Sequence, residues 1–537
     1  MGVFSNSRLF LLPSLDLNVK EQEKIDKFLL LLDSSNVADI LKKHINNQTV
    51  LGGRPHKNFY RLFATILYGF ANGRNTLRDL ADACQFDLRY IYLMEQEIVS
   101  YTTFQTYISK YITPNANEIF GKINSFICKE MGIEFEDAFI DGTKQEANSN
   151  KCKFVWKPTT FHERLSNTTN SIIKNLNLID NYNDEQLIKS STIAIAITHL
   201  NSKKETLDFK TYNDNLKALS LILTKVLEYE EKEQICGPSR KSYYKTDHDA
   251  TAMCLKSDYY SGLGTNMHAA YNVQILVIKG ITLSYYISSS RSDINDFIPL
   301  LESFKAIYGV YPKRICADAG YGSFENYSYL KRNNIENYVK YFSWENNVSG
   351  SFPDCYRIDD VSKNIVCLNK NTGYEIAIPF RHPKKAGSKF YRVDGCNSCD
   401  FKKYCKKYMK EQNEDYKIFE VVVELQLLKQ EAERNLLSPK GIEMRVNRSI
   451  QVEGIFGIEK QNYGYKRFRR RGKENVETEM MLSLLGLNIA KLFRFYESGK
   501  TNKYWIAPID LQAETFAKPS AKRLSKKGER INKKQYK

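Results

Sequence analysis

Residues 138–151 read AFIDGTKQEANSNK, and the expected fold is organised around this stretch. An apolar run over residues 135–140 predicts a buried strand that ends on Asp141, with Gly142 directly after it to open a turn. Because a strand holds a side chain more rigidly than a loop does, Asp141 is placed as a metal ligand would be. Asp-Gly is also ordinary turn chemistry, so a strand cap without further role is the alternative.

A second short apolar strand that ends in an acid, RICAD at residues 314–318, lies far downstream and ends on Asp318. The elements expected between and after the two acids are a hairpin over 269–278 and 281–288, a helix over 293–308, a helix over 324–332 and a strand over 335–341. This alternation predicts an α/β protein with a mixed sheet. It matches the ribonuclease H-like arrangement, in which the first and fourth strands lie side by side, so Asp141 and Asp318 would meet at adjacent strand ends.

The third candidate acid, Glu453, lies on a helix expected after a break at residues 438–441. Glu453 and Lys460 are seven residues apart, so two helical turns return them to nearly the same face, which also carries Val446, Ser449 and Phe456. A carboxylate on such a partly apolar face is costly unless it is paired or metal-bound. A plain salt bridge of Glu453 is the alternative.

Three converging acids would call for cations. Unit charges about 4 Å apart repel by roughly 4 kcal/mol per pair at an effective dielectric constant near 20. Carboxylate oxygens with water in the remaining positions favour Mg²⁺, with Mn²⁺ as a substitute, and two such ions suit in-line displacement at phosphorus. We therefore expect Asp141, Asp318 and Glu453 to be catalytic residues that hold two Mg²⁺ ions.

The overall charge points to a polyanionic partner. The 537 residues carry 79 Lys and Arg against 62 Asp and Glu, a net charge of +17, which favours nucleic acid or an anionic membrane surface. No run of about 18 apolar residues predicts a membrane span. No export signal is recognisable, so the 11 cysteines should be reduced thiols or metal ligands in an intracellular, cytoplasmic protein.

A basic run follows the expected Glu453 helix. Its members are Lys466, Arg467, Arg469, Arg470 and Arg471. A charge run is usually a solvated face, but beside an acid cluster it would hold DNA phosphates near the chemistry. The basic tail over residues 501–537 is expected to be a nonspecific nucleic-acid contact or only a solubilising segment.

The chain divides into five expected regions. Residues 1–130 predict a helical region for DNA binding or dimerisation, with a plain helical bundle as the alternative. Residues 131–345 are the first part of the core, with a helical insertion at about 159–235, and 421–500 are its last part. Residues 346–420 form a cysteine-rich insertion between them, and 501–537 are the basic tail.

The cysteine-rich insertion has the spacing of a zinc site. Cys396, Cys399 and Cys405 follow the pattern Cys-x2-Cys-x5-Cys, and Cys367 is the natural fourth ligand. Cys355 and His382 compete for that place. A site closed by four ligands would be structural, because no coordination position stays open for a substrate. Reduced cysteines that pack an inserted subdomain are the alternative.

The segments FIDGTKQEANSNKCKFVWK, ADAGYGS and VEGIFGIEKQNYGYKRFRRRG, taken in this order, resemble those of bacterial insertion-sequence transposases of the DDE type. The resemblance covers nearly all of residues 52–495 and is nearest to insertion sequence family 1182, allied to families 4 and 5. It implies that the family's two aspartates and glutamate fall on Asp141, Asp318 and Glu453. Lys460 falls on a lysine that contacts DNA near the cut in relatives.

The resemblance further implies a ribonuclease H-like core, Mg²⁺ dependence, binding of terminal inverted repeats, 3′-end cleavage and strand transfer into target DNA. A homodimer on paired ends, associated with the nucleoid, is expected. One departure stands out: the family 4 signature places Tyr and Arg seven and four residues before the glutamate, where this chain has Val446 and Ser449, with Arg448 adjacent. The alternatives are a retired transposase that only binds DNA, and a nuclease of this fold without strand transfer.

Overall fold

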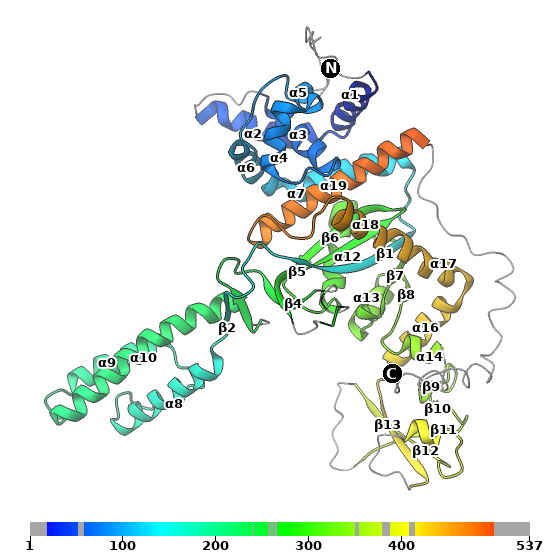
Figure 1. Ribbon diagram of the computed structural model, residues 1–537. Helices are drawn as coiled ribbons and strands as arrows, with labels where there is room; N and C mark the ends of the chain where they lie inside the picture. Colours follow the sequence, from blue (N-terminus) through cyan, green and yellow to red (C-terminus); the bar gives the residue numbers. More distant parts are fainter. Residues whose placement is uncertain are drawn as a thin grey trace, which may run out of the picture.

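The computed structural model describes residues 19–51, 58–238, 240–255, 258, 261–262, 266–348, 354–378, 387–406 and 414–498. The basic tail over residues 501–537 and the competing zinc ligand His382 lie outside these ranges. Within them the chain is a mixed α/β protein, with a helical N-terminal region above a mixed sheet (Figure 1).

Seven helices form the N-terminal region. They are α1 (Val19–Ser34), α2 (Val37–Leu51), α3 (Phe59–Ala71), α4 (Leu77–Phe86), α5 (Leu88–Leu93), α6 (Tyr101–Tyr107) and α7 (Ala116–Met131). Helix α3 is apolar on nearly all sides and is buried among the others. Helix α4 is capped at its start, because the Thr76 side chain accepts a hydrogen bond from the Asp79 backbone N–H.

The arginines of this region are largely bound to acids of the same region. Arg61 pairs with Glu95 at 3.2 Å and is buried. Arg74 and Arg89 both pair with Asp87, at 3.0 and 2.7 Å. These contacts fit the expectation of a plain helical bundle at least as well as that of a DNA-binding surface.

The central sheet has the order β4-β5-β1-β7-β8, with β6 paired to β5. Its strands are β1 (Asp137–Glu146), β4 (Thr251–Cys254), β5 (Met267–Ile278), β6 (Ile281–Ser288), β7 (Arg314–Ala317) and β8 (Glu336–Val339). The antiparallel pairs involve β4, β5, β6 and β1, whereas β1, β7 and β8 are parallel. The strand with the second acid thus lies beside the strand with the first.

Strand β1 corrects the expectation that the strand ends at Asp141. It continues to Glu146 because its antiparallel partner β5 is 12 residues long and pairs with β1 from Phe139 to Glu146. Gly142 therefore lies within the strand and opens no turn there. A Cβ at Gly142 would lie 2.4 Å from the Gln274 Oε1 on β5, so the glycine makes room for that side chain.

Helices cover the sheet and join it to the N-terminal region. They are α12 (Phe297–Tyr308), α13 (Phe324–Arg332), α14 (Trp344–Val348), α16 (Val423–Leu437), α17 (Pro439–Arg448), α18 (Gly454–Gly457) and α19 (Lys473–Ser498). Helix α19 packs against α3, α7 and β6, and a Cβ at its Gly486 would lie 2.6 Å from the Phe70 backbone. Asn488 of α19 also bonds both Thr282 of β6 and Asn124 of α7.

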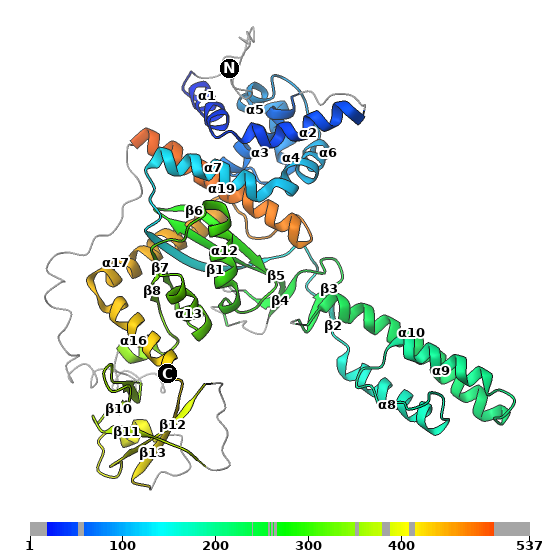
Figure 2. The same ribbon diagram turned by 180° about the vertical axis from the view of Figure 1, so that it is seen from behind.

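A helical arm projects from the side of the sheet in both views (Figures 1 and 2). It consists of α8 (Thr159–Asn175), α9 (Ser190–Ser202) and α10 (Phe209–Cys236), and it has an apolar core of its own. The two short strands β2 (Phe154–Trp156) and β3 (Ser242–Tyr244) pair at its base. This is the segment for which a helical insertion is expected.

A small second sheet contains the clustered cysteines. Its order is β13-β12-β11-β10-β9. Its elements are β9 (Tyr356–Ile358), β10 (Ile365–Cys367), β11 (Thr372–Ile376), β12 (Lys389–Asp394), α15 (Lys402–Cys405) and β13 (Tyr416–Val421). This sheet also has a separate apolar core. Over the residues described, no helix is long and apolar enough to cross a membrane.

Candidate active site

Asp141 and Asp318 lie on neighbouring parallel strands. Phe139 of β1 is in register with Cys316 of β7, so two residues further along each chain Asp141 stands opposite Asp318. Neighbouring strands are about 4.8 Å apart, which places the two carboxylates side by side at the point where β7 ends. Backbone amides orient both side chains: the Gly142 N–H donates to Asp141 Oδ1 at 2.9 Å, and the Gly320 N–H donates to Asp318 Oδ1 at 2.8 Å.

The segment that carries Glu453 runs along the same face of β1. Side chains of a strand alternate between its two faces, so Asp141, Thr143 and Gln145 point the same way. Arg448 Nη1 lies 3.2 Å from Asp141 Oδ2, the Lys460 ammonium bonds the Thr143 hydroxyl, and Gln145 donates to the backbone carbonyl of residue 465. Glu453 lies in the chain between the first two of these contacts, and its side chain is exposed.

Two π-helical turns interrupt the regular helix expected around Glu453. The turns span Ser449–Glu453 and Ile458–Asn462. A π turn bonds residue i to residue i+5, so it shifts the side-chain directions that regular helix spacing predicts. Arg448, directly before the first turn, lies 3.2 Å from Asp141. The missing signature arginine thus has a neighbour in sequence that reaches the acids.

The guanidinium of Arg448 lies in the field of all three candidate acids. Burial acts to lower the pKa of Arg448, but the negative charges of Asp141, Asp318 and Glu453 and the neighbouring Cys316 outweigh it, so the pKa is raised. Arg448 is only 14% exposed and its partner Asp141 is 19% exposed. Arg448 therefore places one positive charge in contact with Asp141.

Three polar residues of the site escape the sequence analysis. The Tyr321 hydroxyl donates to Gln274 Oε1, and the Gln274 amide donates to Asp293 Oδ1 at 2.9 Å. Burial, and then the charges of Asp293, Asp141 and Asp318, raise the pKa of Tyr321 well above its usual value. A usable signal exists for Gln274, because it is a polar residue in the middle of a strand that is otherwise apolar.

The carboxylates fit a divalent cation by chemistry, since Mg²⁺ prefers hard oxygen ligands. Among the residues that the structure describes, no three His, Cys, Asp or Glu side chains are arranged to hold a metal ion. Arg448 supplies a positive charge in contact with one of the acids, 3.2 Å from Asp141.

The basic run divides into exposed and internal members. Arg467 bonds the backbone carbonyls of Ala147 and Ser149, at 3.0 and 2.9 Å, and Arg471 bonds that of Asn148 at 2.9 Å. These contacts attach the run to the segment that leaves β1. Lys466 is exposed, as are the outer parts of Arg467, Arg469 and Arg471.

Arg470 differs from the rest of the run because its guanidinium nitrogens are buried, and burial lowers its pKa. The backbone N–H groups of Arg469 and Arg470 both donate to the buried carboxylate of Glu479, at 3.0 and 2.9 Å. In this arrangement Arg470 does not present its charge to DNA.

Four cysteines gather around one small cavity. Cys367, Cys396, Cys399 and Cys405 all line a space of about 20 Å³, which is close to the volume that one water molecule needs. Cys405 also shares a hydrogen bond with Cys355, which together with the ammonium of Lys417 at 3.1 Å lowers the pKa of Cys405 to about 6. All four expected ligands line this cavity and Cys355 lies close to Cys405, but among the described residues the cysteines are not arranged to hold a metal ion.

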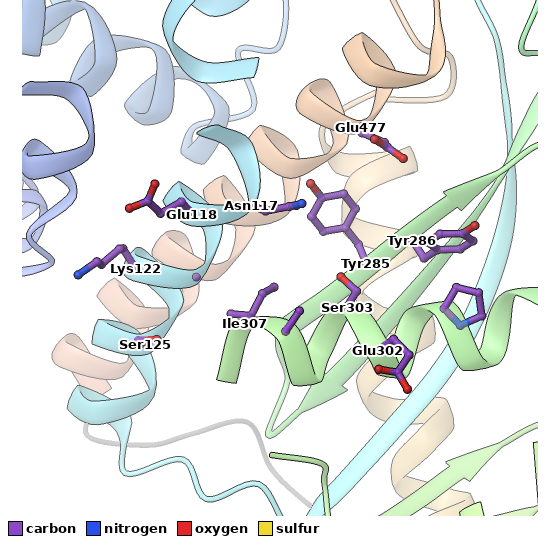
Figure 3. Close-up of a pocket in the computed structure, with 13 residues that line it drawn as sticks. Asn117, Glu118, Lys122, Ser125, Tyr285, Tyr286, Glu302, Ser303, Ile307 and Glu477 are labelled. Atoms are coloured by element: carbon purple, nitrogen blue, oxygen red, sulfur yellow. The ribbon is translucent and has the colours of Figure 1, made fainter. Parts of the chain in front are cut away.

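A large cavity elsewhere in the fold is separate from the strands that carry Asp141 and Asp318. It measures about 980 Å³ and lies between α7, β6, α12 and α19 (Figure 3). Its charged lining residues are Glu118, Glu302, Glu477 and Lys122. An excess of carboxylates repels DNA phosphates, and neither Asp141 nor Asp318 lines this space.

Two family models match the chain. Residues 367–493 match a model described as Transposase DDE domain, and residues 13–110 match a model described as Transposase domain (DUF772). The first match contains Glu453, Lys460, the basic run and the four cysteines, whereas Asp141 and Asp318 lie outside both. No match was found among curated proteins or among solved structures.

Proposed function

Since its two matched domains identify the chain as a DDE-type transposase related to those of bacterial insertion sequences, we propose that it cuts DNA at the 3′ ends of a mobile element and joins them to target DNA. The observation that supports this proposal is the position of Arg448, whose pKa is raised by the negative charges of Asp141, Asp318 and Glu453. We place the protein in family 1182 and its core among ribonuclease H-like folds.

We propose that Asp141, Asp318 and Glu453 hold two Mg²⁺ ions, for which Mn²⁺ can substitute. Bound there, the ions supply an activated water or 3′-hydroxyl and stabilise the leaving oxygen at phosphorus. The parallel register of β1 and β7 orients the two aspartates. Glu453 is exposed, so its side chain is free of tight packing and can turn toward them.

The chain's own cations would position the DNA. Lys460, fixed beside Thr143 two residues from Asp141, is suited to hold a phosphate near the cut. Lys466, Arg467, Arg469 and Arg471 would continue the contact along the backbone of double-stranded DNA, at the terminal inverted repeats or the target. We expect Arg470, whose guanidinium is buried, to stabilise the fold of this segment and not to contact DNA.

Two cuts have to be coordinated at two ends of an element, so we propose that a homodimer assembles on paired ends. Such a protein would act at the nucleoid in the bacterial cytoplasm. Sedimentation of the protein with a DNA that carries two inverted repeats should give a complex with two chains. A complex with one chain would contradict this part of the proposal.

We propose that Cys367, Cys396, Cys399 and Cys405 hold a structural Zn²⁺, with Cys355 beside the site. Four thiolates around a small cavity suit a closed tetrahedral zinc site. Native mass spectrometry of the purified protein should show one zinc per chain. Cys396→Ser should lose it, whereas Cys152→Ser, at an exposed cysteine of the arm base, should keep it.

The experiment that tests the proposed function is a comparison of Asp318→Asn with the wild type on inverted-repeat DNA. We expect the variant to lose Mg²⁺-dependent cleavage and to bind DNA as the wild type does. Loss of binding together with cleavage would indicate a structural role for Asp318. With pre-cut ends and a target plasmid, joined products identify a transposase, whereas cleavage without joining identifies a nuclease.

A further inference from the structure

The base of the helical arm is a two-stranded ribbon with an exposed aromatic pair. Strands β2 and β3 pair antiparallel, with Phe154 opposite Tyr244 and Trp156 opposite Ser242. The ribbon lies between the main sheet and the arm (Figures 1 and 2). Phe154 and Trp156 are two residues apart, so both side chains stand on the same face.

The two rings form a supported platform. Phe154 is 43% exposed and Trp156 is 60% exposed, and their ring centroids are 5.4 Å apart at an interplanar angle of 88°. The ring of Tyr244, which is buried, lies 6.4 Å from that of Phe154 on the opposing strand. Large aromatic side chains normally bury their faces, so an exposed pair held by a strand indicates a binding surface.

The positive charges around the aromatic pair favour a negatively charged partner. The stretches 150–157 and 240–246 contain six cations and no acid, namely Lys151, Lys153, Lys157, Arg240, Lys241 and Lys245. Lys157 and Arg240 bond backbone carbonyls, which leaves their charge unneutralised. Aromatic rings among cations are the composition that binds single-stranded nucleic acid, because bases stack on the rings while phosphates meet the cations.

The ribbon follows soon after β1, the strand that carries Asp141. Thirteen residues separate Asp141 from Phe154, so the two lie no more than about 45 Å apart along the chain. The intervening segment is attached to Arg467 and Arg471 of the basic run. The basic run therefore contacts residues 147–149, and Phe154 of the ribbon follows five residues after Ser149.

We propose that Phe154 and Trp156 form a stacking site for an unpaired base of the bound DNA, with the surrounding lysines on its phosphates. This inference rests on the proposed function, because it takes DNA as the substrate, and adds a place for a nucleotide that has left the duplex. Stacking on an aromatic face accepts every base. We therefore expect the site to recognise single-strandedness and to be indifferent to sequence.

The test compares two DNA probes of the same duplex sequence, one blunt and one with a four-nucleotide 3′ overhang that contains 2-aminopurine. The fluorescence of 2-aminopurine falls when it stacks, so wild-type protein should quench the overhang. Phe154→Ala and Trp156→Ala should each weaken binding of the overhang probe by about 10-fold, the usual effect of removing one stacking ring. Binding of the blunt probe should not change.

Matched variants separate stacking from simple loss of structure. Trp156→Phe keeps a flat ring and should retain the quenching, whereas Trp156→Leu keeps an apolar side chain and should lose it. Phe209→Ala removes an 84% exposed ring at the far end of α10, about 40 Å from the ribbon along the helix, and should have no effect.

Each other outcome overturns the inference. Equal losses for both probes would mean that the pair supports general DNA binding, and no loss for either would assign the rings to another partner such as a protein. If the protein binds blunt DNA but does not prefer the overhang, only this inference fails. If it binds neither probe, the proposed function fails as well.

Discussion

The segment over residues 449–479 has acids on two sides, and they differ in their surroundings. On the side of β1, Glu453 is exposed, and its negative charge raises the pKa of Arg448 together with the charges of Asp141 and Asp318. On the side of α19, Glu459 and Glu479 are almost fully buried and bound by neutral donors: the Ser483 hydroxyl for the first, and backbone amides for the second. A cluster of acids alone does not indicate chemistry, whereas acids that remain accessible around a cation do.

The clearest test of this difference is whether an acid on the β1 side is required for DNA cleavage. Asp141→Asn should lower Mg²⁺-dependent DNA cleavage by about 10³-fold or more, because a ligand shared by the reacting ions is lost. Single-turnover cleavage of inverted-repeat DNA measures this. Glu459→Gln, on the other side, is the matched control and should cut at close to the wild-type rate.

The second prediction concerns the pH dependence that the α19 side should produce. Burial raises the pKa of Glu459 from its usual 4.5 to about 7. A carboxyl group whose pKa is raised by folding stabilises the protein below about pH 4.5, and this stability is lost as the pH rises through about 7. Between pH 5 and pH 8 the free energy of unfolding should fall by about 2.5 kcal/mol relative to Glu459→Gln.

Urea denaturation at the two pH values measures that difference. Glu459 Oε2 is buried without a hydrogen-bond partner among the residues that the structure describes, which is why the charged form is unfavourable there. Equal pH dependence in the wild type and in Glu459→Gln would refute the assignment.

The third prediction tests the support of the basic run. Glu479→Ala removes the acceptor of two backbone N–H groups and should lower the free energy of unfolding by about 2 kcal/mol. DNA affinity should fall with it, because Arg469 and Lys466 lose their fixed positions. Glu479→Gln keeps an acceptor oxygen and should lose less of both. Unchanged affinity in Glu479→Ala would mean that the run needs no such support.

The smallest effect is expected for Arg448. Arg448→Ala leaves the partly buried acids without their cation and should destabilise the protein by about 1–2 kcal/mol in the absence of divalent ions. Added Mg²⁺ should recover most of this loss, since it supplies the missing charge. Thermal unfolding with Mg²⁺ and with EDTA measures the recovery, and Arg448→Lys is the control. An equal loss in both conditions would separate Arg448 from the proposed ion site.

Much of this arrangement follows from the order of elements in the sequence. Apolar runs that end in Asp141 and Asp318, separated by a hairpin and a helix, predict neighbouring strands, because a crossover helix returns the chain parallel to the sheet. The mixed α/β class is confirmed by the structure. The cap at Thr76 was also predictable, since capping is decided by residues three apart.

Other features could not be read from local patterns. No residue pattern indicates the π turn at Ser449–Glu453, and regular spacing did not point to Arg448, the side chain that contacts Asp141. Strand β1 continues beyond Asp141 because it pairs with the long strand β5. The residues near Asp141 do not indicate the length of β5. Arg61 pairs with Glu95, which lies 34 residues away in sequence, and Arg470 is internal because the fold buries its guanidinium nitrogens. A charge pattern alone therefore could not separate internal arginines from exposed ones.

Manganese binding tests the central claim most directly. Electron paramagnetic resonance of free Mn²⁺, titrated into the full chain with inverted-repeat DNA, reports how many ions each variant takes up. We predict that Asp141→Asn, Asp318→Asn and Glu453→Gln each weaken Mn²⁺ binding by at least about 10-fold, while Glu459→Gln binds as the wild type does. Wild-type binding by any one of the first three variants would contradict a site shared by these acids.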